Sequence, residues 1–416
     1  MLDLKYLRTN WDKVKHIVEL RGESVDIDKL KELDNQRRQL VRECDTKRAE
    51  LNQLTREIGK LKREGRDDPK LIEAARQLSD EIDKLEQQLR SIEAEFMQLL
   101  LWIPNTVHAS VPLDEPKTLR EVGGFREHKF EGLDHFTFAE QLGMVDFVRG
   151  AKVAGSNFPL YVGWGARLER ALLNYMLDFH VKRGFKEVFT PFVANRQSMI
   201  GTGQLPKLED DMYHIEREDF FLNPTAEVTV ANLHREEILP EEKLPLRYVA
   251  YTACFRREAG SYGKGTRGLK RVHQFNKVEL FSFAHPERSY QELEFLLNEA
   301  EEVIKSLGLR YRVVLLPIYE LGFAAAKTYD IEVWAPVSKE WLEVSSVSNC
   351  EAFQARRAKI KFRTKHRTDY VHTLNASGVA TPRTFIAILE TYQNADGSLT
   401  IPEVLRPYMD GRERIP

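Results

Sequence analysis

Residues 246–281 read LRYVAYTACFRREAGSYGKGTRGLKRVHQFNKVELF, which is two runs of β-forming residues around a glycine-rich connection. This pattern predicts an antiparallel hairpin with a loop longer than most hairpins use. Because side chains alternate along a strand, one face is expected to carry Arg271, His273, Phe275, Lys277 and Glu279. Cations suit phosphate, an aromatic ring suits a base, and a carboxylate accepts from a hydroxyl or amine, so we interpret this face as a ligand floor. A solvent-exposed face of alternating charges is the alternative, and a buried Phe275 would count against it.

The residues on both sides of this loop resemble a known family. The segments FRRE at 255–258, TRGL at 266–269 and HQFNKVE at 273–279 resemble motif 2 of class II aminoacyl-tRNA synthetases, and specifically of the seryl-tRNA synthetases. The resemblance extends over nearly the whole chain. It implies an α+β fold, in which an antiparallel helical coiled-coil arm precedes a class II catalytic domain on an antiparallel β-sheet flanked by helices. It assigns residues 1–103 to a tRNA-binding domain and 104–416 to the catalytic domain, with motif 2 at about 246–281.

Length and composition set limits on the class of protein. A chain of 416 residues predicts two or three domains. The net charge is −2, so any basic surface for nucleic acid would have to be local. No stretch approaches the ~20 apolar residues that span a bilayer, and the first residues carry acids and do not resemble a signal sequence. Cys44, Cys254 and Cys350 are widely separated and favour neither a disulfide framework nor a zinc site. We therefore expect a cytoplasmic protein without a membrane segment.

Apolar residues recur at alternating three- and four-residue steps over 30–61 and again over 71–99, and GRDDP at 65–69 separates the two segments. The pattern predicts two helices that fold back as an antiparallel coiled coil, after a single short helical segment over 1–27. Each helix would be roughly 50 Å long at 1.5 Å per residue, so we interpret the hairpin as a projecting arm. A dimerisation coil is the alternative that the pattern leaves open.

Basic residues gather near the turn of this hairpin and favour contact with RNA, although acidic residues are interspersed among them. In seryl-tRNA synthetases such an arm grips the tRNA, and the resemblance implies the same use here. The residues expected to bind tRNA are Arg56, Lys60, Lys62, Arg63, Arg66 and Lys70.

Residues 163–193 resemble motif 1, the class II dimer element. GWGARLERA at 163–171 opens a helix with apolar residues at helical spacing, and a strand at 187–190 is stopped by Pro191. The resemblance implies a homodimer. An amphipathic helix packed inside one subunit fits the same pattern.

Residues 373–394 resemble motif 3. Thr381 and Pro382 favour a helix start, and a helix is expected over 384–394. Arg383 then lies in the first turn, next to amides that favour an anion, so phosphate is its expected partner.

The resemblance implies a site for ATP, L-serine and Mg²⁺. The expected catalytic residues are Arg256, Glu279 and Arg383. The residues expected to bind serine are Thr225, Ala226, Glu227, Glu279 and Ser377. The residues expected to bind ATP are Arg256, Arg257, Glu258, Phe275, Glu343, Val344, Ser345, Ser346 and Arg383. Glu343 and Ser346 are also the expected Mg²⁺ ligands, because this ion prefers hard oxygen ligands and keeps several waters. Two strands are predicted here, over 332–334 and 342–346, and a surface strand with a solvated Glu343 is the alternative.

The expected function is that of a serine–tRNA ligase, which activates L-serine with ATP to seryl-adenylate and transfers it to the 3′ end of tRNA(Ser), with tRNA(Sec) as a further candidate. The alternative is a catalytically impaired paralogue that acts as an RNA- or protein-binding module. It is motivated by departures from the family pattern, chiefly Ile318, Tyr319 and Glu320 where the family has Thr-Gly-Asp. The retained site residues favour the active enzyme. We expect Tyr319 to turn outward and Glu320 to substitute for the acid. A ligase that loads a carrier protein is disfavoured, because the long arm would then have no use.

Overall fold

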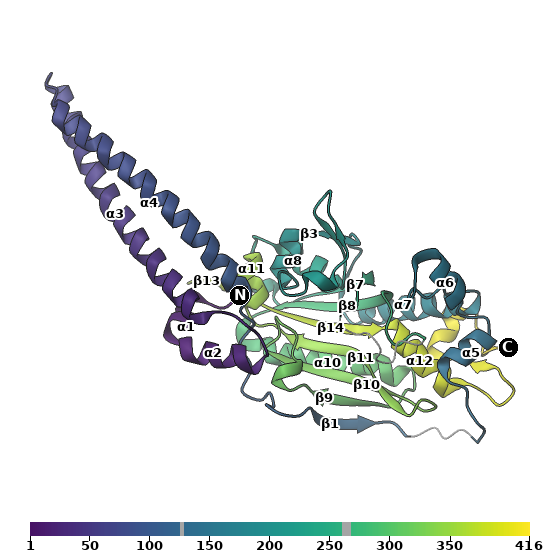
Figure 1. Ribbon diagram of the computed structural model, residues 1–416. Coiled ribbons are helices and arrows are strands. Elements are labelled where there is room, and N and C mark those ends of the chain that lie inside the picture. The colour runs from purple at the N-terminus through teal and green to yellow at the C-terminus, as the bar shows by residue number, and fades with distance from the viewer. Residues whose placement is uncertain (125–128, 260–267) are drawn as a thin grey trace. The chain divides into compact units, whose positions relative to one another are not determined.

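The computed structural model describes residues 1–124, 129–259 and 268–416, and it divides into two compact units (Figure 1). One unit is Asp3–Pro104, and the other comprises Met1–Leu2 with Asn105–Pro416. Thr266 and Arg267, which contribute to the resemblance to motif 2, lie outside the described residues, as do three of the four loop glycines.

The smaller unit begins with two helices, α1 (Leu4–Thr9) and α2 (Trp11–Leu20), so the expectation of a single helical segment over 1–27 is wrong. The break lies at Asn10, whose backbone leaves the helical region with φ −139° and ψ 35°. Its side-chain amide donates to the carbonyl of Tyr6 at 2.9 Å, and Thr9 Oγ1 donates to the same carbonyl at 3.1 Å. Such local side-chain bonds compete with helix continuation and end α1.

The predicted helical hairpin is confirmed as α3 (Ile27–Arg63) and α4 (Pro69–Leu101), which run side by side in Figure 1. Asp26 caps α3 through the amide of Lys29, and Asp68 caps α4 just before Pro69. Ion pairs across the hairpin give its direction, since the α4 partners of Lys47 and Arg48 both precede the partner of Arg37 in the chain. They are Arg37–Glu93 at 3.0 Å, Lys47–Glu81 at 2.6 Å and Arg48–Glu86 at 2.7 Å. The helices are therefore antiparallel, as expected.

An eight-stranded sheet organises the larger unit, in the order β1-β9-β10-β11-β14-β8-β7-β2. Neighbouring strands are antiparallel except β2 and β7, which confirms the predicted antiparallel sheet. The strands are β1 (Lys117–Val122), β2 (Lys186–Val188), β7 (Leu246–Phe255), β8 (Gln274–Ala284), β9 (Tyr311–Leu315), β10 (Lys327–Ala335), β11 (Glu340–Asn349) and β14 (His372–Ala380). The pairing of β7 with β8 runs from Leu246 opposite Phe283 to Phe255 opposite Gln274, which confirms the predicted hairpin.

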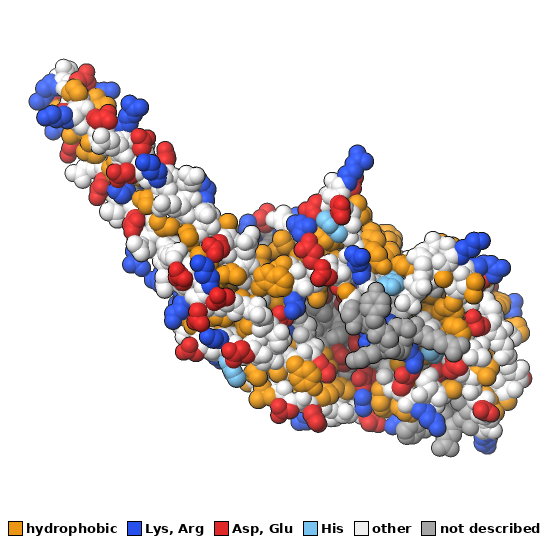
Figure 2. Space-filling model, in the orientation of Figure 1, with side chains coloured by type: hydrophobic (Ala, Val, Ile, Leu, Met, Phe, Trp, Pro, Cys, Tyr) orange, Lys and Arg blue, Asp and Glu red, His pale blue; other side chains and the backbone are white. Residues whose placement is uncertain are grey.

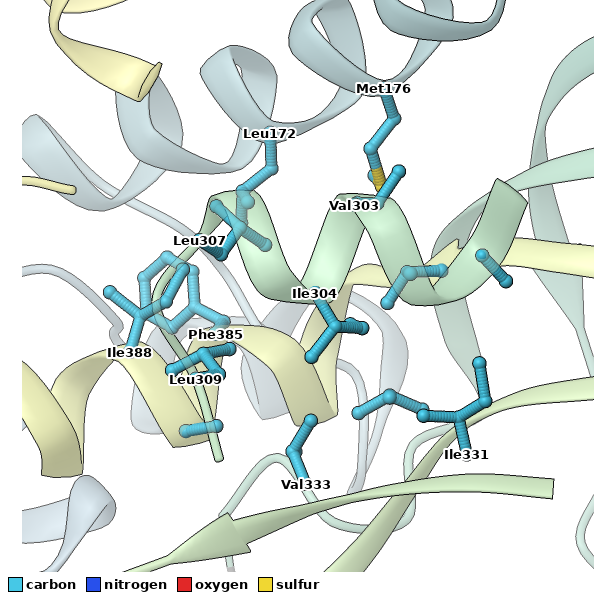
Figure 3. Close-up of a cluster of buried hydrophobic side chains, with 14 of the residues drawn as sticks. Leu172, Met176, Val303, Ile304, Leu307, Leu309, Ile331, Val333, Phe385 and Ile388 are labelled. Atoms are coloured by element: carbon cyan, nitrogen blue, oxygen red, sulfur yellow. The ribbon is translucent and has the colours of Figure 1, made fainter. Parts of the chain in front are cut away.

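Helices α7 (Trp164–Lys182), α10 (Ser289–Ser306) and α12 (Thr381–Tyr392) pack on one face of this sheet. Figure 3 shows their apolar side chains meeting those of β10, with Met176, Ile304 and Ile331 among them. Helix α12 begins at Thr381, three residues before the expected start, because Pro382 fits the unbonded first turn. Strand β2 ends at Val188 and is shorter than expected, since the chain already turns toward Pro191.

The remaining elements surround this core. The other helices are α5 (His135–Gln141), α6 (Phe147–Ala154), α8 (Arg196–Thr202), α9 (Ala226–Ala231) and α11 (Phe353–Ala358). Three small sheets pair β3 (Val193–Asn195), β5 (Phe220–Leu222) and β4 (His214–Ile215); β13 (Thr368–Tyr370), β12 (Lys361–Arg363) and β6 (Ile238–Pro240); and β15 (Leu399–Thr400) with β16 (Arg414–Ile415). Among the residues that the structure describes, no helix combines the length and the apolar character that a membrane crossing requires.

Candidate active site

A cavity of about 460 Å³ lies on the sheet face opposite α7 and α10, and Pro382 and Arg383 at the start of α12 also line it. Strand alternation produces this division: Val278, Leu280 and Ile331 enter the core, while Lys277 and Glu279 line the cavity. Of the site residues expected from the sequence, the structure brings together Thr225, Glu227, Arg256, Glu258, Phe275, Glu279, Glu343, Val344, Ser346, Ser377 and Arg383 in its walls.

The side chains of the floor differ from expectation in how deeply they are buried. Phe275 is only half-buried, whereas Lys277 and Glu279 are 7% and 2% exposed. Phe275 is therefore less buried than the pattern suggested, and the alternative of a solvent-exposed charged face is wrong for Lys277 and Glu279. The reason is pairing, because Lys277 Nζ lies 2.5 Å from a carboxylate oxygen of Glu279 and the two charges are buried together.

One end of the cavity, the acid end, consists of Thr225, Glu227, Lys277, Glu279 and Ser377. Thr225 caps α9 and donates from Oγ1 to Glu279 Oε2 at 3.0 Å. Ser377 stands opposite Glu279 in the pairing of β14 with β8. Burial, together with the neighbouring carboxylate of Glu279, raises the pKa of Glu227 to about 7. Two acidic side chains share one lysine here, so a second cation, such as an ammonium group, could balance the remaining carboxylate. Sequence reasoning placed Lys277 on the floor but gave it no role.

The other end, the arginine end, consists of Arg256, Phe275, Glu343, Ser346 and Arg383. The guanidinium carbon of Arg256 lies 5.2 Å from the centre of the Phe275 ring. Arg383 in the first turn of α12 donates from Nη1 to the carbonyl of Glu343 at 2.9 Å and to its carboxylate at 3.3 Å. Two arginines beside a half-buried aromatic ring can hold phosphates and a base.

Glu343 and Ser346 can serve as oxygen ligands for a divalent cation beside Asp330, which sequence reasoning missed. Asp330 stands opposite Ser346 in the pairing of β10 with β11, and is 8% exposed. Within the described parts of the chain, its Oδ1 has no hydrogen-bond partner, and no group of three His, Cys, Asp or Glu could by itself hold a metal ion. Burial and the nearby Glu343 raise the pKa of Asp330 well above its ordinary value. A cation bound by Glu343 and Ser346, with other ligands from phosphate and water, fits this unpaired oxygen.

Three residues expected from the sequence are not in the cavity wall. Arg257 is exposed, and its guanidinium carbon lies 5.9 Å from the ring centre of Tyr213. Ser345 is buried and donates from its hydroxyl to the carbonyl of Ser377 at 2.6 Å. Ala226 is fully buried in the apolar cluster of α9. The geometry therefore gives these residues no direct approach to a ligand in the cavity.

The departure at residues 318–320 forms a short 3₁₀ turn, Ile318–Glu320. Tyr319 is 52% exposed and absent from the cavity wall, whereas Glu320 lines the cavity. The expectation that Tyr319 turns outward is confirmed.

The six basic residues at the hairpin turn are all exposed, and Figure 2 shows acidic side chains mixed with basic ones at that end of the arm. Arg66 pairs with Glu64 there. The surface is suitable for RNA phosphates but is not uniformly basic.

Known proteins match the chain throughout. The profile described as "Seryl-tRNA synthetase N-terminal domain" matches residues 1–107, and "tRNA synthetase class II core domain (G, H, P, S and T)" matches residues 208–392. The serine–tRNA ligase of Thermodesulfovibrio yellowstonii is 52% identical, over 98% of this chain and 99% of that protein. The crystal structure of seryl-tRNA synthetase from Pyrococcus horikoshii complexed with ATP has a TM-score of 0.92 and 36% identity, covering 100% of this chain and 99% of that chain. That of cytoplasmic serine–tRNA ligase from Naegleria fowleri in complex with AMP has a TM-score of 0.86 and 29% identity, covering 100% and 98%. The chain therefore belongs to the seryl-tRNA synthetase family of class II aminoacyl-tRNA synthetases.

Proposed function

We propose that this protein is a serine–tRNA ligase, which activates L-serine with ATP to seryl-adenylate and transfers the seryl group to the 3′ end of tRNA(Ser), with tRNA(Sec) as a further candidate. The observation that carries the proposal is that one cavity joins the acid end to the arginine end. An amino acid at the first and ATP at the second would bring the serine carboxylate to the α-phosphorus. The relatives with bound ATP and AMP support this use of the cavity.

The first step is attack of the serine carboxylate on the α-phosphorus, which forms a mixed anhydride and releases pyrophosphate. Positioning and charge neutralisation dominate such phosphoryl chemistry. Arg256 would hold the α-phosphate, Arg383 the γ-phosphate, and Phe275 the adenine ring. Arg383 must exchange the carboxylate of Glu343, which it now contacts at 3.3 Å, for phosphate oxygens.

The acid end would select serine. Glu279 and Ser377 would hold the serine hydroxyl, and Glu227 the ammonium group. Alanine has no hydroxyl, so it would leave buried acceptors unpaired, which is the kind of site that discriminates strongly.

Mg²⁺ would be held by Glu343 and Ser346, with Asp330 close by, and would supply charge neutralisation on the phosphates. These side chains would also orient the polyphosphate along the arginine end.

The domain assignment to residues 1–103 and 104–416, the tRNA contacts of the arm, the homodimer and the cytoplasmic location are part of the same proposal. The 77% exposed ring of Phe189, just after β2, supports a second copy at that edge of the sheet.

A variant without residues 30–99, with the ends joined, tests the arm. It is expected to keep serine-dependent pyrophosphate exchange and lose charging of tRNA. Normal charging would favour a dimerisation coil.

The direct test of the enzyme is ATP–pyrophosphate exchange with serine, alanine, threonine and glycine in parallel. Exchange should depend on serine and be weak with the other three amino acids. The alternative of an impaired paralogue predicts ATP binding without exchange. It is not favoured, because the relatives match over the full length and Tyr319 leaves the cavity free.

A further inference from the structure

Helix α7 carries two buried polar side chains behind the floor of the cavity. Glu169 is 5% exposed and His180 is fully buried. Eleven residues separate them, which is about three turns at 3.6 residues per turn, so both project from the same side of α7. Neither residue lines the cavity.

Glu169 joins two elements of the arginine end. Its Oε1 accepts from Asn276 Nδ2 at 2.9 Å and is also contacted by Thr381 Oγ1. Asn276 lies next to Phe275 on β8, and Thr381 begins α12 two residues before Arg383. The Thr381 hydroxyl also lies 3.0 Å from the carbonyl of Asn276. The carboxyl group of Glu169 therefore ties the strand of the aromatic ring to the helix of the arginine.

His180 meets the acid end from behind. A Cβ on Gly378 would lie 3.2 Å from His180 Nε2, so the ring packs directly against that glycine. Gly378 sits in a bulge, where the pairing of β14 with β8 shifts between Ser377 and Val379. Val379 has φ +131°, a conformation that side-chain-bearing residues rarely adopt.

The Nδ1 edge of the His180 ring, away from Gly378, faces Glu299. Its Nδ1 lies 3.7 Å from Glu299 Oε2. Arg183 holds the carboxylate of Glu299 with two hydrogen bonds of 2.6 and 2.7 Å. The ring is thus held against the bulge that carries Ser377.

We propose that α7 positions the two ends of the cavity separately, with Glu169 as the positioning residue for the arginine end and His180 as the positioning residue for the acid end. The proposal rests on the proposed function, since it takes Phe275 and Arg383 as ATP contacts and Ser377 as a serine contact. If α7 only filled the core, changes at either residue would alter stability without separating the two substrates.

The test of Glu169 compares Glu169→Leu with Glu169→Gln. The leucine variant leaves the Asn276 amide unpaired, and the ATP dissociation constant, measured by calorimetry without serine, should rise about tenfold. The KM for serine should change by less than about twofold. Glutamine keeps an acceptor oxygen and should restore ATP binding to within about threefold of the unaltered protein. Thr381→Val, a milder change, should reproduce part of the ATP effect.

The test of His180 is a double-mutant cycle. Gly378→Ala places a methyl group against the ring and should raise the KM for serine about tenfold, with ATP binding unchanged. His180→Ala in the same chain removes the ring and should return much of the lost serine affinity. The rescue is expected to be partial, because Val278 atoms also lie 3.3 and 3.4 Å from the new methyl position.

The two sets of variants control for each other. Constants for ATP and serine that move together in every variant, or melting temperatures that fall while both constants stay unchanged, would overturn the proposal. Additive effects of Gly378→Ala and His180→Ala would show that His180 does not position the acid end. The unaltered protein is the reference: if it shows no serine-dependent exchange, the proposed function fails, while the ATP-binding measurements still decide the role of Glu169.

Discussion

The acid end and the arginine end of the cavity pair their charges in different ways. At the acid end Lys277 and Glu279 are almost fully buried, and Thr225 already donates to the carboxylate. At the arginine end the side chains of Arg383 and Glu343 are 30% and 46% exposed and hold each other. The first arrangement is present without substrate, whereas the proposed binding of phosphate to Arg383 would require the second to change partners. The proposed function therefore assigns the selection of serine to the buried acid end and the binding of phosphate to the more exposed arginine end.

Replacing Arg256 by Ala should have the largest effect. The side chain is half-buried, lies near the Phe275 ring and donates from Nε to the carbonyl of Pro224 at 3.4 Å. Its loss should lower serine-dependent exchange by about 10²–10³-fold, because it removes a cation that acts on developing charge. The melting temperature should stay nearly constant. Exchange at an unchanged rate in the folded variant would remove Arg256 from the mechanism.

A matched pair of carboxylate changes tests the difference in burial directly. Glu279→Ala leaves the Lys277 ammonium group buried and unpaired, and should lower the free energy of unfolding by about 3 kcal/mol or more, as well as raising the KM for serine. Glu343→Ala removes an exposed partner and should cost less than about 1 kcal/mol, while weakening ATP binding. Urea unfolding of both variants gives the comparison. Equal losses of stability would mean that the two ends are not organised differently.

Burial also makes one carboxyl group of the acid end sensitive to pH near neutrality. The pKa of Glu227 is raised to about 7, chiefly by burial and then by Glu279, while Lys277 and Arg256 act in the opposite direction. The carboxyl group is therefore neutral below this pH and charged above it. If it binds the serine ammonium group, the KM for serine should fall roughly tenfold between pH 6 and pH 8.

The matched control is Glu227→Gln, which should flatten this pH profile. The KM for ATP should follow the same pH profile in the glutamine variant as in the unaltered protein. A pH profile for serine that persists in the glutamine variant would assign the titration to another group.

The sequence predicted which face of a helix or strand each side chain occupies better than it predicted how deeply that side chain is buried. Heptad spacing identified α3 and α4 because a coiled coil is a local pattern, and strand alternation placed Phe275 and Glu279 on one side. Alternation does not reveal which of these side chains is buried, since that depends on strands far away in the chain. Asp330 was missed because it becomes notable only opposite Ser346, and a bulge between Ile331 and Glu332 interrupts the simple alternation. The adjacent residues Arg256 and Arg257 were both expected to bind ATP, although Arg256 lines the cavity and Arg257 does not.

The smallest effect is expected at the departure from the family pattern, residues 318–320. Tyr319 is exposed and outside the cavity wall, while Glu320 keeps an acid in it. Changing Ile318, Tyr319 and Glu320 together to Thr, Gly and Asp should therefore alter the KM for serine by less than about threefold, since solvent-facing changes rarely matter. ATP binding should change little, because the substitution leaves Arg256, Phe275 and Arg383 in place. A rise in exchange of several hundredfold from a nearly inactive protein would show instead that the present turn impairs the site. The impaired paralogue would then be the correct interpretation.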